Sequence, residues 1–331
     1  MSIESVLKEA VISIGGKGAF GSELYHRIKY GTAKVLGAVK GEVGYSKWFY
    51  HLYTGKKLNL DNPTHFDEKI WWLKLNNRDP MLTLCSDKNA VRGYVSECGY
   101  ADILIPQLDV FESVDQLDFS KYDKEVIAKC NHNSGGHILY DPEKTVAETE
   151  ISAQKRKIGF ILKQNASVLS REWNYKNIKP KIVVEEVIRD HEGNLPLDYK
   201  FMCFDGEPKL LFLDLGVINK DGSYNHNYPR NIYDMDFNLL PVHETRPNAD
   251  YPVEKPKNFE RMVEIARKLS EPFPFCRVDL YNVDGDIYFG EITFYHGGGC
   301  NNIQPEEWDI KMGSWIDLDS PKVKRESENK K

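Results

Sequence analysis

The chain has 331 residues, 41% of them hydrophobic and 28% charged, and a formal net charge of −6. This length allows two lobes, and the composition is that of an ordinary soluble globular protein. The acidic balance argues against a dedicated nucleic-acid binder, because such proteins normally carry an excess of basic residues.

Three absences in the sequence narrow the class of protein further. The six cysteines, at positions 85, 98, 130, 203, 276 and 300, show no C-x-x-C spacing, which argues against a zinc site or a disulfide scaffold. No apolar run approaches the ~18 residues of a transmembrane segment, and no secretory signal opens the chain. We therefore expect a cytoplasmic protein in a reducing environment.

The first part of the chain reads as helical. Residues 1–85 are predicted as a helical N-terminal region, although frequent glycines weaken the prediction of one long regular helix. Thr64 is a candidate N-cap for a helix whose apolar stripe begins at Phe66. Ser86 is predicted to begin a second helix, which Gly99 ends, and Lys88 lies in its first turn.

From residue 125 the pattern changes to short strands and hairpins. The predicted strands are 126–129, 137–140, 182–184, 199–204 and 209–213, followed by an amphipathic helix over 259–269 and a closing hairpin over 277–294. Strands in hairpins with segregated helices indicate an α+β fold with antiparallel sheets. The locally basic C-terminus, residues 316–331, is predicted to be a disordered tail, with weak contact to a membrane surface as the alternative.

The closing hairpin carries the most informative pattern in the chain. Alternation along an extended strand places Arg277 and Asp279 on one face, and the return strand places Glu291 and Thr293 on a common face. A two-residue turn at 284–285 would send the two carboxylates to opposite faces, whereas an odd loop with a left-handed glycine would bring all four side chains together. Such a convergence suits magnesium and a phosphoryl group, and the alternative is a half-exposed strand with solvated charges.

Three other segments are candidates for binding a nucleotide. The loop after Lys129 contains Ser134-Gly135-Gly136, whose glycines would let backbone N–H groups approach phosphate oxygens; the alternative is an ordinary hairpin turn. Glu185-Glu186 ends a buried strand and could accept a hydrogen bond from an adenine amino group, or simply mark where that strand surfaces. Lys200 is either solvated or directed at a terminal phosphate.

These segments form a series in one order along the chain. The series is Asn62–Ile70, Asp87-Lys88 with Val91-Arg92, Lys129–His132 with Ser134–Gly136, Arg171-Glu172-Trp173, Lys179-Pro180 with Glu185-Glu186, Asp198–Phe201 and the 277–294 hairpin. On these motifs, from about Leu58 to Asp309, the chain resembles the ATP-grasp superfamily. Within it, the chain resembles the TupA-like family, which is linked to the synthesis of teichuronopeptide and other bacterial surface polysaccharides.

The resemblance implies an ATP-grasp fold, in which two α+β lobes with antiparallel sheets clasp ATP. The small lobe would cover residues 86–186 and the large lobe residues 187–315. The residues that would contact ATP are Lys88, Lys129, Ser134, Gly135, Gly136, Glu185, Glu186, Val187, Ile188, Glu192 and Lys200. The residues that would bind one or two magnesium ions are Asp279, Glu291 and Thr293, and the catalytic residues would be Arg277 and Lys200.

Two features depart from the pattern of the wider superfamily. Thr293 stands where most ATP-grasp enzymes have Asn, so a second magnesium ion would depend on a weaker hydroxyl ligand. The segment 295–300 lacks the usual Pro-Gly, and its glycines are expected to let backbone N–H groups approach the acceptor. Candidate contacts to the second substrate are Arg230, His226, His296, Gly297 and Gly298.

By this resemblance the chain is an ATP-dependent ligase that joins a carboxylate to an amine through an acyl phosphate. The expected partners are a uronic-acid-bearing glycan or sugar precursor and an amino acid or small amine, with no nucleic acid. One alternative is a glycosyltransferase of surface-polysaccharide synthesis that holds manganese and a nucleotide sugar at Asp234 and Asp236. Another alternative is a kinase built on the same ATP-binding fold.

Overall fold

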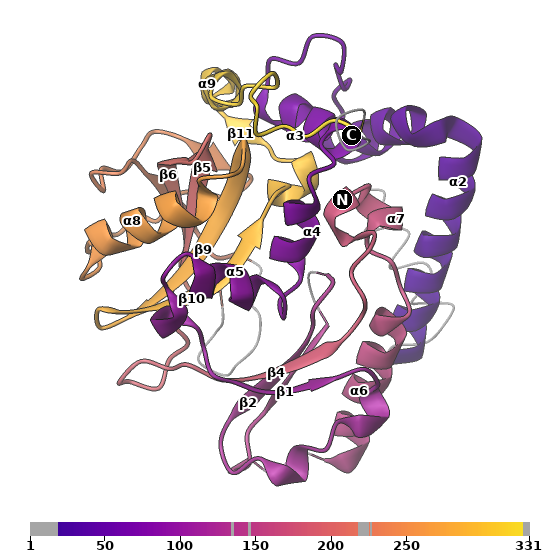
Figure 1. The fold of residues 1–331 in the computed structure, drawn as a ribbon, viewed down its shortest axis with the longest axis vertical. Coiled ribbons are helices and arrows are strands. Elements are labelled where there is room, and N and C mark those ends of the chain that lie inside the picture. Colours follow the sequence, from indigo (N-terminus) through magenta and orange to yellow (C-terminus); the bar gives the residue numbers. More distant parts are fainter. Residues whose placement is uncertain (1–18, 134–135, 145–146, 218–224, 226, 327–331) are drawn as a thin grey trace. The chain divides into compact units, whose positions relative to one another are not determined.

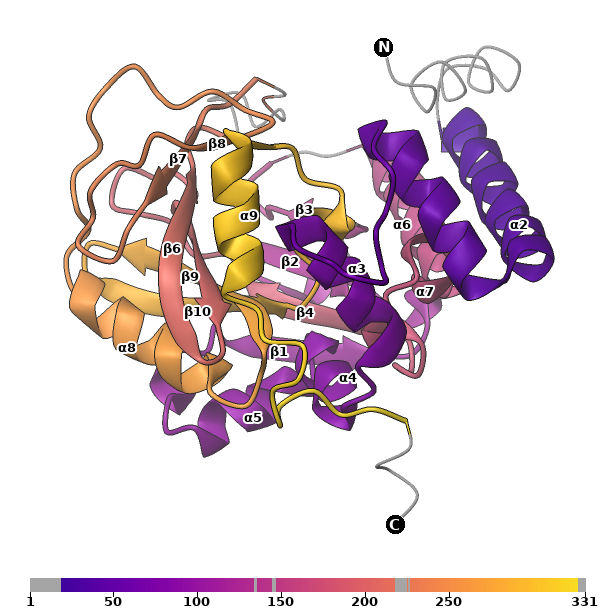
Figure 2. The same ribbon diagram turned by 90° about the horizontal axis from the view of Figure 1, so that it is seen from above.

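Figure 1 and Figure 2 show the computed structural model, which describes residues 19–133, 136–144, 147–217, 225 and 227–326. The described chain divides into two compact units. The first unit contains the described residues of 1–58, 87–89 and 106–187, and the second contains 59–86, 90–105 and the described residues of 188–331. The segments of the two units alternate along the chain. The sequence predicts two consecutive lobes, and the boundaries given for those lobes remain a prediction.

The first unit is built on a four-stranded antiparallel sheet with the strand order β1-β4-β2-β3 (Figure 1). Its elements are α2 Ala19–Thr54, β1 Gln107–Phe111, β2 Val126–Cys130, β3 His137–Tyr140, α6 Glu148–Leu162, α7 Ser167–Ser170 and β4 Ile182–Glu186, with short 3-10 helices at Val114–Gln116, Phe119–Lys121 and Trp173–Tyr175. Alternate residues of β2 and β4, among them Ala128 and Val184, are fully buried and form a core with Ile158 of α6. Lys129 and Glu185 therefore lie on the other face of this sheet.

Helix α2 confirms the predicted helical N-terminal region within the described residues. It runs for 36 residues, but Gly41, with φ 67° and ψ 174°, interrupts the helical backbone. Gly37 has a packing role, because a Cβ there would lie 1.8 Å from Nη2 of Arg171. In the described part of the chain, no helix has both the length and the apolar character needed to cross a membrane.

The second unit is built on a five-stranded antiparallel sheet with the strand order β10-β9-β5-β6-β7 (Figure 2). Its strands are β5 Asp198–Phe204, β6 Glu207–Asp214, β7 Arg230–Tyr233, β9 Phe275–Val283 and β10 Asp286–Thr293, and a separate pair is β8 His243–Glu244 with β11 Ile303–Gln304. Its helices are α3 Phe66–Asn76, α4 Pro80–Ser86, α5 Val91–Glu97, α8 Phe259–Ser270 and α9 Glu306–Ser314, with 3-10 turns at Ala101–Ile103 and at His296–Gly299, the latter labelled η5. Antiparallel sheets with helices outside them confirm the predicted α+β class.

Helix α8 covers one face of the five-stranded sheet and leaves the other face for polar side chains. Phe201 of β5 packs on Phe259 of α8, with the ring centroids 5.9 Å apart. Because side chains alternate along a strand, Asp198 and Lys200 point to the opposite face. The amphipathic helix predicted over 259–269 is thereby confirmed.

The β9–β10 hairpin brings the predicted side chains together by a different route from the one expected. Its turn has two residues, Asp284 and Gly285, both with positive φ (55° and 110°). Of the two alternatives this is the two-residue Asp-Gly turn and not the odd loop, and alone it would separate the two carboxylates. A β-bulge at Gly290 shifts the register by one residue, so Asp279 pairs with Glu291 on the face away from α8.

Replacing Gly290 with alanine should lower the free energy of unfolding by about 1–3 kcal/mol. A Cβ at this position would lie 3.0 Å from the Asp279 carbonyl oxygen, which is tighter than a normal contact. Gly93→Ala in helix α5 is the matched control, since nothing lies within 4 Å of its Cβ and it should gain roughly 0.5–1 kcal/mol. Chemical denaturation measures both variants, and a Gly290→Ala protein as stable as the wild type would contradict the role of the bulge.

The C-terminal segment is not the disordered tail that the sequence predicts over 316–331. Ile316 and Val323 are buried, and the Arg78 backbone N–H donates to the Lys324 carbonyl at 2.7 Å. Two buried apolar side chains and backbone hydrogen bonds thus hold this segment against the rest of the second unit, although its basic composition predicted a solvent-exposed tail. The correction applies to residues 316–326, and residues 327–331 lie outside the described part of the chain.

Candidate active site

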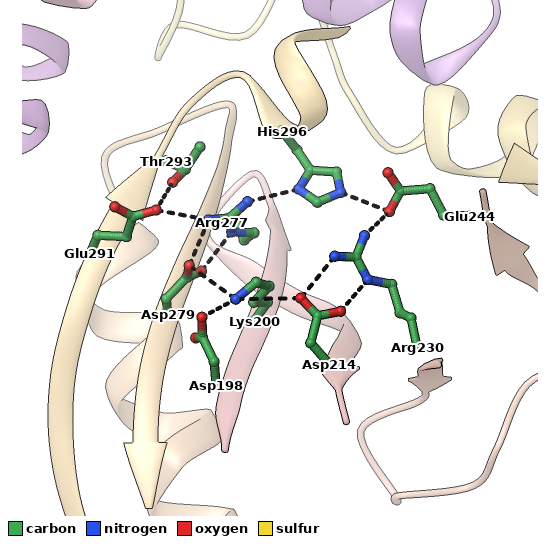
Figure 3. A network of polar contacts seen from close by, with 10 residues as sticks. All are labelled: Asp198, Lys200, Asp214, Arg230, Glu244, Arg277, Asp279, Glu291, Thr293 and His296. Carbon is green, nitrogen blue, oxygen red and sulfur yellow. Dashed lines mark hydrogen bonds and ion pairs between the residues drawn. The ribbon is translucent and has the colours of Figure 1, made fainter. Parts of the chain in front are cut away.

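A connected network of charged side chains lies on the face of the five-stranded sheet away from α8 (Figure 3). The strands contribute Asp198, Lys200, Asp214, Arg230, Arg277, Asp279, Glu291 and Thr293, and Glu244 and His296 complete the network. Strand register explains the convergence, because Lys200 pairs with Asp279 and Asp279 pairs with Glu291. The residues predicted to be catalytic and metal-binding in this hairpin and in β5 are therefore neighbours.

Arg277 lies in the middle of this network and is buried. Its Nε and Nη2 atoms each donate to an oxygen of Asp279 at 2.6 Å, and Nη2 also donates to Glu291 Oε1 at 2.9 Å. Thr293 Oγ1 donates to the same Glu291 oxygen at 3.0 Å. Burial opposes the charge, but the carboxylates of Asp279 and Glu291 raise the pKa of Arg277. The guanidinium is therefore a fixed positive charge where two carboxylates meet.

Lys200 is a second buried cation. Its ammonium contacts Asp198 and lies 3.8 Å from both Asp214 Oδ2 and Asp279 Oδ2. Burial alone would lower the pKa of Lys200, but the neighbouring carboxylates, first of all Asp279, raise it. Asp198 Oδ1 is buried and has no hydrogen-bond partner among the described residues, so an acceptor remains open beside the charged amine.

A buried relay connects β7 to Arg277. Arg230 donates to Glu244 Oε2 at 2.5 Å, and the same oxygen lies 3.1 Å from His296 Nε2. Because a guanidinium can only donate, His296 Nδ1 accepts from Arg277 Nη1 at 3.0 Å, and the ring proton resides on Nε2 and faces Glu244. Burial lowers the pKa of His296, which keeps the ring neutral. His296 thus orients Arg277 and is itself oriented by Glu244.

Arg230 and His296, which the sequence predicts to contact a second substrate, are both part of this relay, and their contact with a substrate stays a prediction. The two residues are only 9% and 2% exposed, and their polar atoms are engaged within the network. Asp214 and Glu244, which make these contacts, were not predicted. Asp214 ends a run of apolar strand residues, and this position could have indicated a site residue. The sequence around Glu244 is rich in loops and contains no pattern that would indicate a role for Glu244.

Glu244→Gln should destabilise the fold by about 3 kcal/mol at neutral pH. Burial opposes ionisation, but the hydrogen bond from His296 and then the charge and hydrogen bond of Arg230 lower the pKa of Glu244 from 4.5 to about 2. A folded pKa below the unfolded one stabilises the fold above pH 4.5, and this contribution is lost as the pH falls toward 2. Denaturation at several pH values should therefore show that the difference in the free energy of unfolding between wild type and variant becomes smaller below pH 4.5. The exposed control Glu254→Gln should unfold with the same free energy as the wild type. A loss of stability in Glu244→Gln that does not change with pH would contradict this account.

The glycine turn η5 is anchored by helix α3. The side chains of Trp71 and Lys74 donate to the carbonyls of Gly299 and Gly298, at 2.8 and 2.5 Å. The Gly298 N–H donates to the Tyr295 carbonyl within the turn at 2.9 Å, and the predicted approach of the Gly297 and Gly298 N–H groups to the acceptor stays a prediction. Gly297 has a φ of 56°, a conformation that favours glycine. Helix α3 thus fixes the turn from which the relay histidine projects.

In the first unit, some of the predicted nucleotide-binding residues contact one another or the loop after β2. Lys129 forms an ion pair with Glu185 at 2.5 Å across β2 and β4. The Lys88 ammonium donates to the Asn133 carbonyl, in the loop that follows β2, at 2.9 Å. Gly136, with a φ of 71°, closes this loop, because its carbonyl accepts from the last N–H of β2 at 3.2 Å. Lys88 thus contacts the loop itself, and the Lys129–Glu185 pair lies on the strands β2 and β4 that adjoin it.

The position of Lys88 depends on a break in the helix predicted from Ser86. The structure ends α4 at Ser86 and begins α5 at Val91. Between them the Lys88 N–H donates to the Asn131 carbonyl at 3.2 Å, and the Asn131 side chain donates to Asp87 at 2.9 Å. These long-range hydrogen bonds override the local helical pattern and hold the turn against the loop.

The remaining predicted ligand residues have fewer contacts or lie elsewhere. Glu186 forms an ion pair with Lys124, and Glu192 is 70% exposed in a turn. The Val187 N–H donates to a backbone carbonyl at 3.2 Å, and Ile188 begins the third segment of the second unit. Three predicted residues, Ser134, Gly135 and His226, lie outside the described residues.

The network in the second unit contains carboxylate oxygens that could hold magnesium together with a bound substrate. Its carboxylates are Asp198, Asp214, Glu244, Asp279 and Glu291, and its cations are Lys200, Arg230 and Arg277, which leaves two excess negative charges while His296 is neutral. Asp279 and Glu291 provide adjacent hard oxygen atoms, which fit magnesium. Among the residues that the structure describes, no three acidic, histidine or cysteine side chains are arranged to hold a metal ion by themselves. Magnesium commonly uses one or two carboxylates and completes its shell with phosphates and water.

The D-x-D pattern of the alternative glycosyltransferase has a local structural role. Asp234 Oδ1 accepts hydrogen bonds from the backbone N–H groups of Asp236 and Asn238, at 3.0 and 2.8 Å. Asp234 Oδ2 accepts a third hydrogen bond from the Asn238 side chain at 3.0 Å. Such bonds are typical of an Asp that stabilises its own turn. The motif that suggested a nucleotide-sugar site therefore gives that alternative no support.

Two antiparallel sheets and an acidic hairpin are the features that the resemblance to ATP-grasp proteins implies. The chain belongs to the TupA-like ATP-grasp family, whose model matches residues 68–317. The predicted family and the predicted ATP-grasp fold are thus confirmed. No curated protein matches the chain in sequence.

The chain is also similar to solved structures of ligases. D-alanine–D-alanine ligase from Bacillus anthracis, complexed with ATP, is 16% identical over 65% of this chain, with a TM-score of 0.36. D-alanine–D-alanine ligase from Helicobacter pylori is 13% identical over 78% of this chain and 68% of its own length, with a TM-score of 0.41. D-cycloserine synthetase DcsG is 14% identical over 72% of this chain and 71% of its own, with a TM-score of 0.36. The chain spans 56% of the length of the B. anthracis ligase.

Proposed function

We propose that the chain is an ATP-dependent ligase that joins a carboxylate to an amine and releases ADP and phosphate. Membership of an ATP-grasp family supports the use of ATP. The observation that carries the proposal is the cluster of Arg277, Asp279 and Glu291 beside Lys200. Phosphoryl transfer depends mostly on positioning and on electrostatic stabilisation, and a buried cluster of fixed charges provides both.

The nucleotide would be bound mainly by residues of the first unit. Lys88 and Lys129 would contact the phosphates, and the loop 131–136 would fold over them. Glu185 to Ile188 would hold the adenine ring through carboxylate and backbone groups, and Glu192 would contact the ribose. The ion pair between Lys129 and Glu185, and the contact of Lys88 with the loop, support this assignment because each contact holds a proposed ligand group in a defined position.

One or two magnesium ions would be held by Asp279, Glu291 and Thr293 together with phosphate oxygens. Bound magnesium neutralises negative charge on the phosphates. The Thr293 hydroxyl donates to Glu291 at 3.0 Å, so it orients that carboxylate in addition to any role as a ligand. The two excess negative charges of the network support this assignment.

In the proposed reaction a substrate carboxylate oxygen attacks the terminal phosphorus of ATP, the bond to ADP breaks, and an acyl phosphate forms. The amine nitrogen then attacks the acyl carbon, loses a proton and displaces phosphate, which gives an amide. Arg277 would stabilise negative charge on the transferred phosphoryl group and on the tetrahedral intermediate. His296 and Asp279 hold the Arg277 guanidinium in one orientation, so little reorganisation is needed. Lys200 would contact the terminal phosphate.

We further propose that the carboxylate belongs to a uronic acid of a capsular or O-antigen precursor, and that the amine is an amino acid or an amino alcohol. The link of the TupA-like family to surface-polysaccharide synthesis supports this choice, and dependence on ATP favours a cytoplasmic location. Incubation with ATP, magnesium, a glucuronate-type glycan and amino acids should produce ADP only when both acceptors are present. Release of AMP, or no nucleotide turnover with any acid, would count against the proposal.

A further inference from the structure

Helix α2 exposes an apolar stripe that the proposed ligase activity does not use. Ile28, Val35 and Val39 are 46%, 63% and 77% exposed, and all lie in the segment of α2 before the break at Gly41. At 3.6 residues per turn they fall within about 40° of one another on one side of the helix. Single exposed apolar side chains are common, but a line of them on one helix face marks an interaction surface.

The opposite side of the same segment is packed within the first unit. Ala33 is buried, and Gly37 lies against the Arg171 guanidinium. The Tyr30 hydroxyl accepts a hydrogen bond from the Asn165 backbone N–H at 3.3 Å. The helix therefore already has its core-facing side, and the apolar stripe points away from it.

Basic side chains flank the stripe on both sides. Arg27 and Lys34 lie about 100–120° to one side of it, and Lys29 and Lys40 lie about as far to the other. The basic residues between positions 27 and 57 are Arg27, Lys29, Lys34, Lys40, Lys47, Lys56 and Lys57, and the one acidic residue there is Glu42. Because the whole chain has a net charge of −6, this region is positive against an acidic background.

We propose that this segment of α2 docks on the surface of an anionic lipid bilayer. The stripe would enter the headgroup region, and the flanking basic side chains would extend to the lipid phosphates. Charge and side-chain size select this partner over two others. A second copy of the same face would bring like charges together, and a protein groove usually receives large aromatic or arginine anchors, which the stripe lacks. A lipid surface has no fixed pockets, so it can bind small apolar side chains.

Because the apolar side chains are small, binding should depend strongly on charge. The test is flotation of the full chain with phosphatidylcholine vesicles, prepared with and without phosphatidylglycerol. The protein should float only with vesicles that contain phosphatidylglycerol, and it should dissociate at ~1 M salt, where the screening length falls to ~3 Å. No flotation with anionic vesicles at low salt, or equal flotation with neutral vesicles, would overturn the proposal.

Paired variants assign the binding to the stripe and its flanks. Val35→Ser with Val39→Ser should weaken vesicle binding on the order of tenfold, and Lys34→Gln with Lys40→Gln on the order of 30-fold. The controls Val110→Ser and Lys144→Gln replace residues of the same unit that are 37% and 70% exposed, and both should bind as wild type does.

The same variants separate lipid docking from self-association and from ligase activity. All of them should keep the wild-type circular dichroism spectrum and the wild-type rate of ADP formation in solution, because the replaced side chains are exposed. If the paired serine variant binds vesicles normally but changes the oligomeric state measured by light scattering, a second copy covers the stripe and the proposal is wrong.

Discussion

Arg277→Lys should lower kcat for ADP formation by about 10²–10³-fold. The guanidinium reaches Asp279, Glu291 and His296 at 2.6 to 3.0 Å. Lysine keeps the positive charge but has a single nitrogen, which cannot span three partners in a fixed plane. The loss should fall on kcat more than on KM, because the negative charge that Arg277 stabilises develops during the reaction. Initial rates at varied ATP and acceptor concentrations measure the effect.

A matched control for this variant is Arg261→Lys. Arg261 lies on helix α8, is 50% exposed and pairs with Glu264 at 3.3 Å, so its replacement should leave the rates unchanged. Thermal denaturation of both variants distinguishes a lost guanidinium from a lost fold. If the Arg277→Lys protein is folded and retains the wild-type kcat, the guanidinium of Arg277 has no role in the reaction.

Glu291→Gln should raise the magnesium concentration needed for half-maximal activity by about 10–100-fold. Glutamine has the shape of glutamate, and its oxygen can still accept from Arg277 and Thr293, which lie 2.9 and 3.0 Å from the carboxylate. It lacks the negative charge that a hard divalent cation prefers. The fold should be retained, since 39% of the Glu291 side chain is exposed.

Magnesium titration at saturating ATP measures this effect, and Glu264→Gln provides the control. The Glu264 side chain is 60% exposed on α8, so its loss should leave the magnesium curve unchanged. A Glu291→Gln protein with the wild-type magnesium curve would show that this carboxylate does not ligate the ion.

Local pattern was enough to predict the hairpins, which side chains share a face within one strand, and the helix over 259–269. Alternation along a strand places Arg277 and Asp279 on one face, and Glu291 and Thr293 on one face, independently of the tertiary structure. The family resemblance added the roles of these residues, and the match over 68–317 confirms the family. The site residues themselves remain predictions that the variants above test.

Long-range contacts could not be predicted in the same way. The Gly290 bulge depends on how two strands pair, and a glycine in a strand is compatible with either a regular ladder or a bulge. Glu244 reaches the network from a two-residue strand, with no local signal for its partners. The break after Ser86 and the docking of the segment around Lys324 follow from hydrogen bonds to residues far along the chain.

The bulge also has a consequence for finding comparable chains. Asp279 and Glu291 face the same way at a separation of twelve positions only because one extra residue is accommodated between them. A hairpin with the same tight turn and an unbroken ladder would achieve the same geometry with one residue fewer. Searches for this pair of acids by a fixed interval would therefore overlook members that lack the insertion, and the interval should be allowed to vary by one.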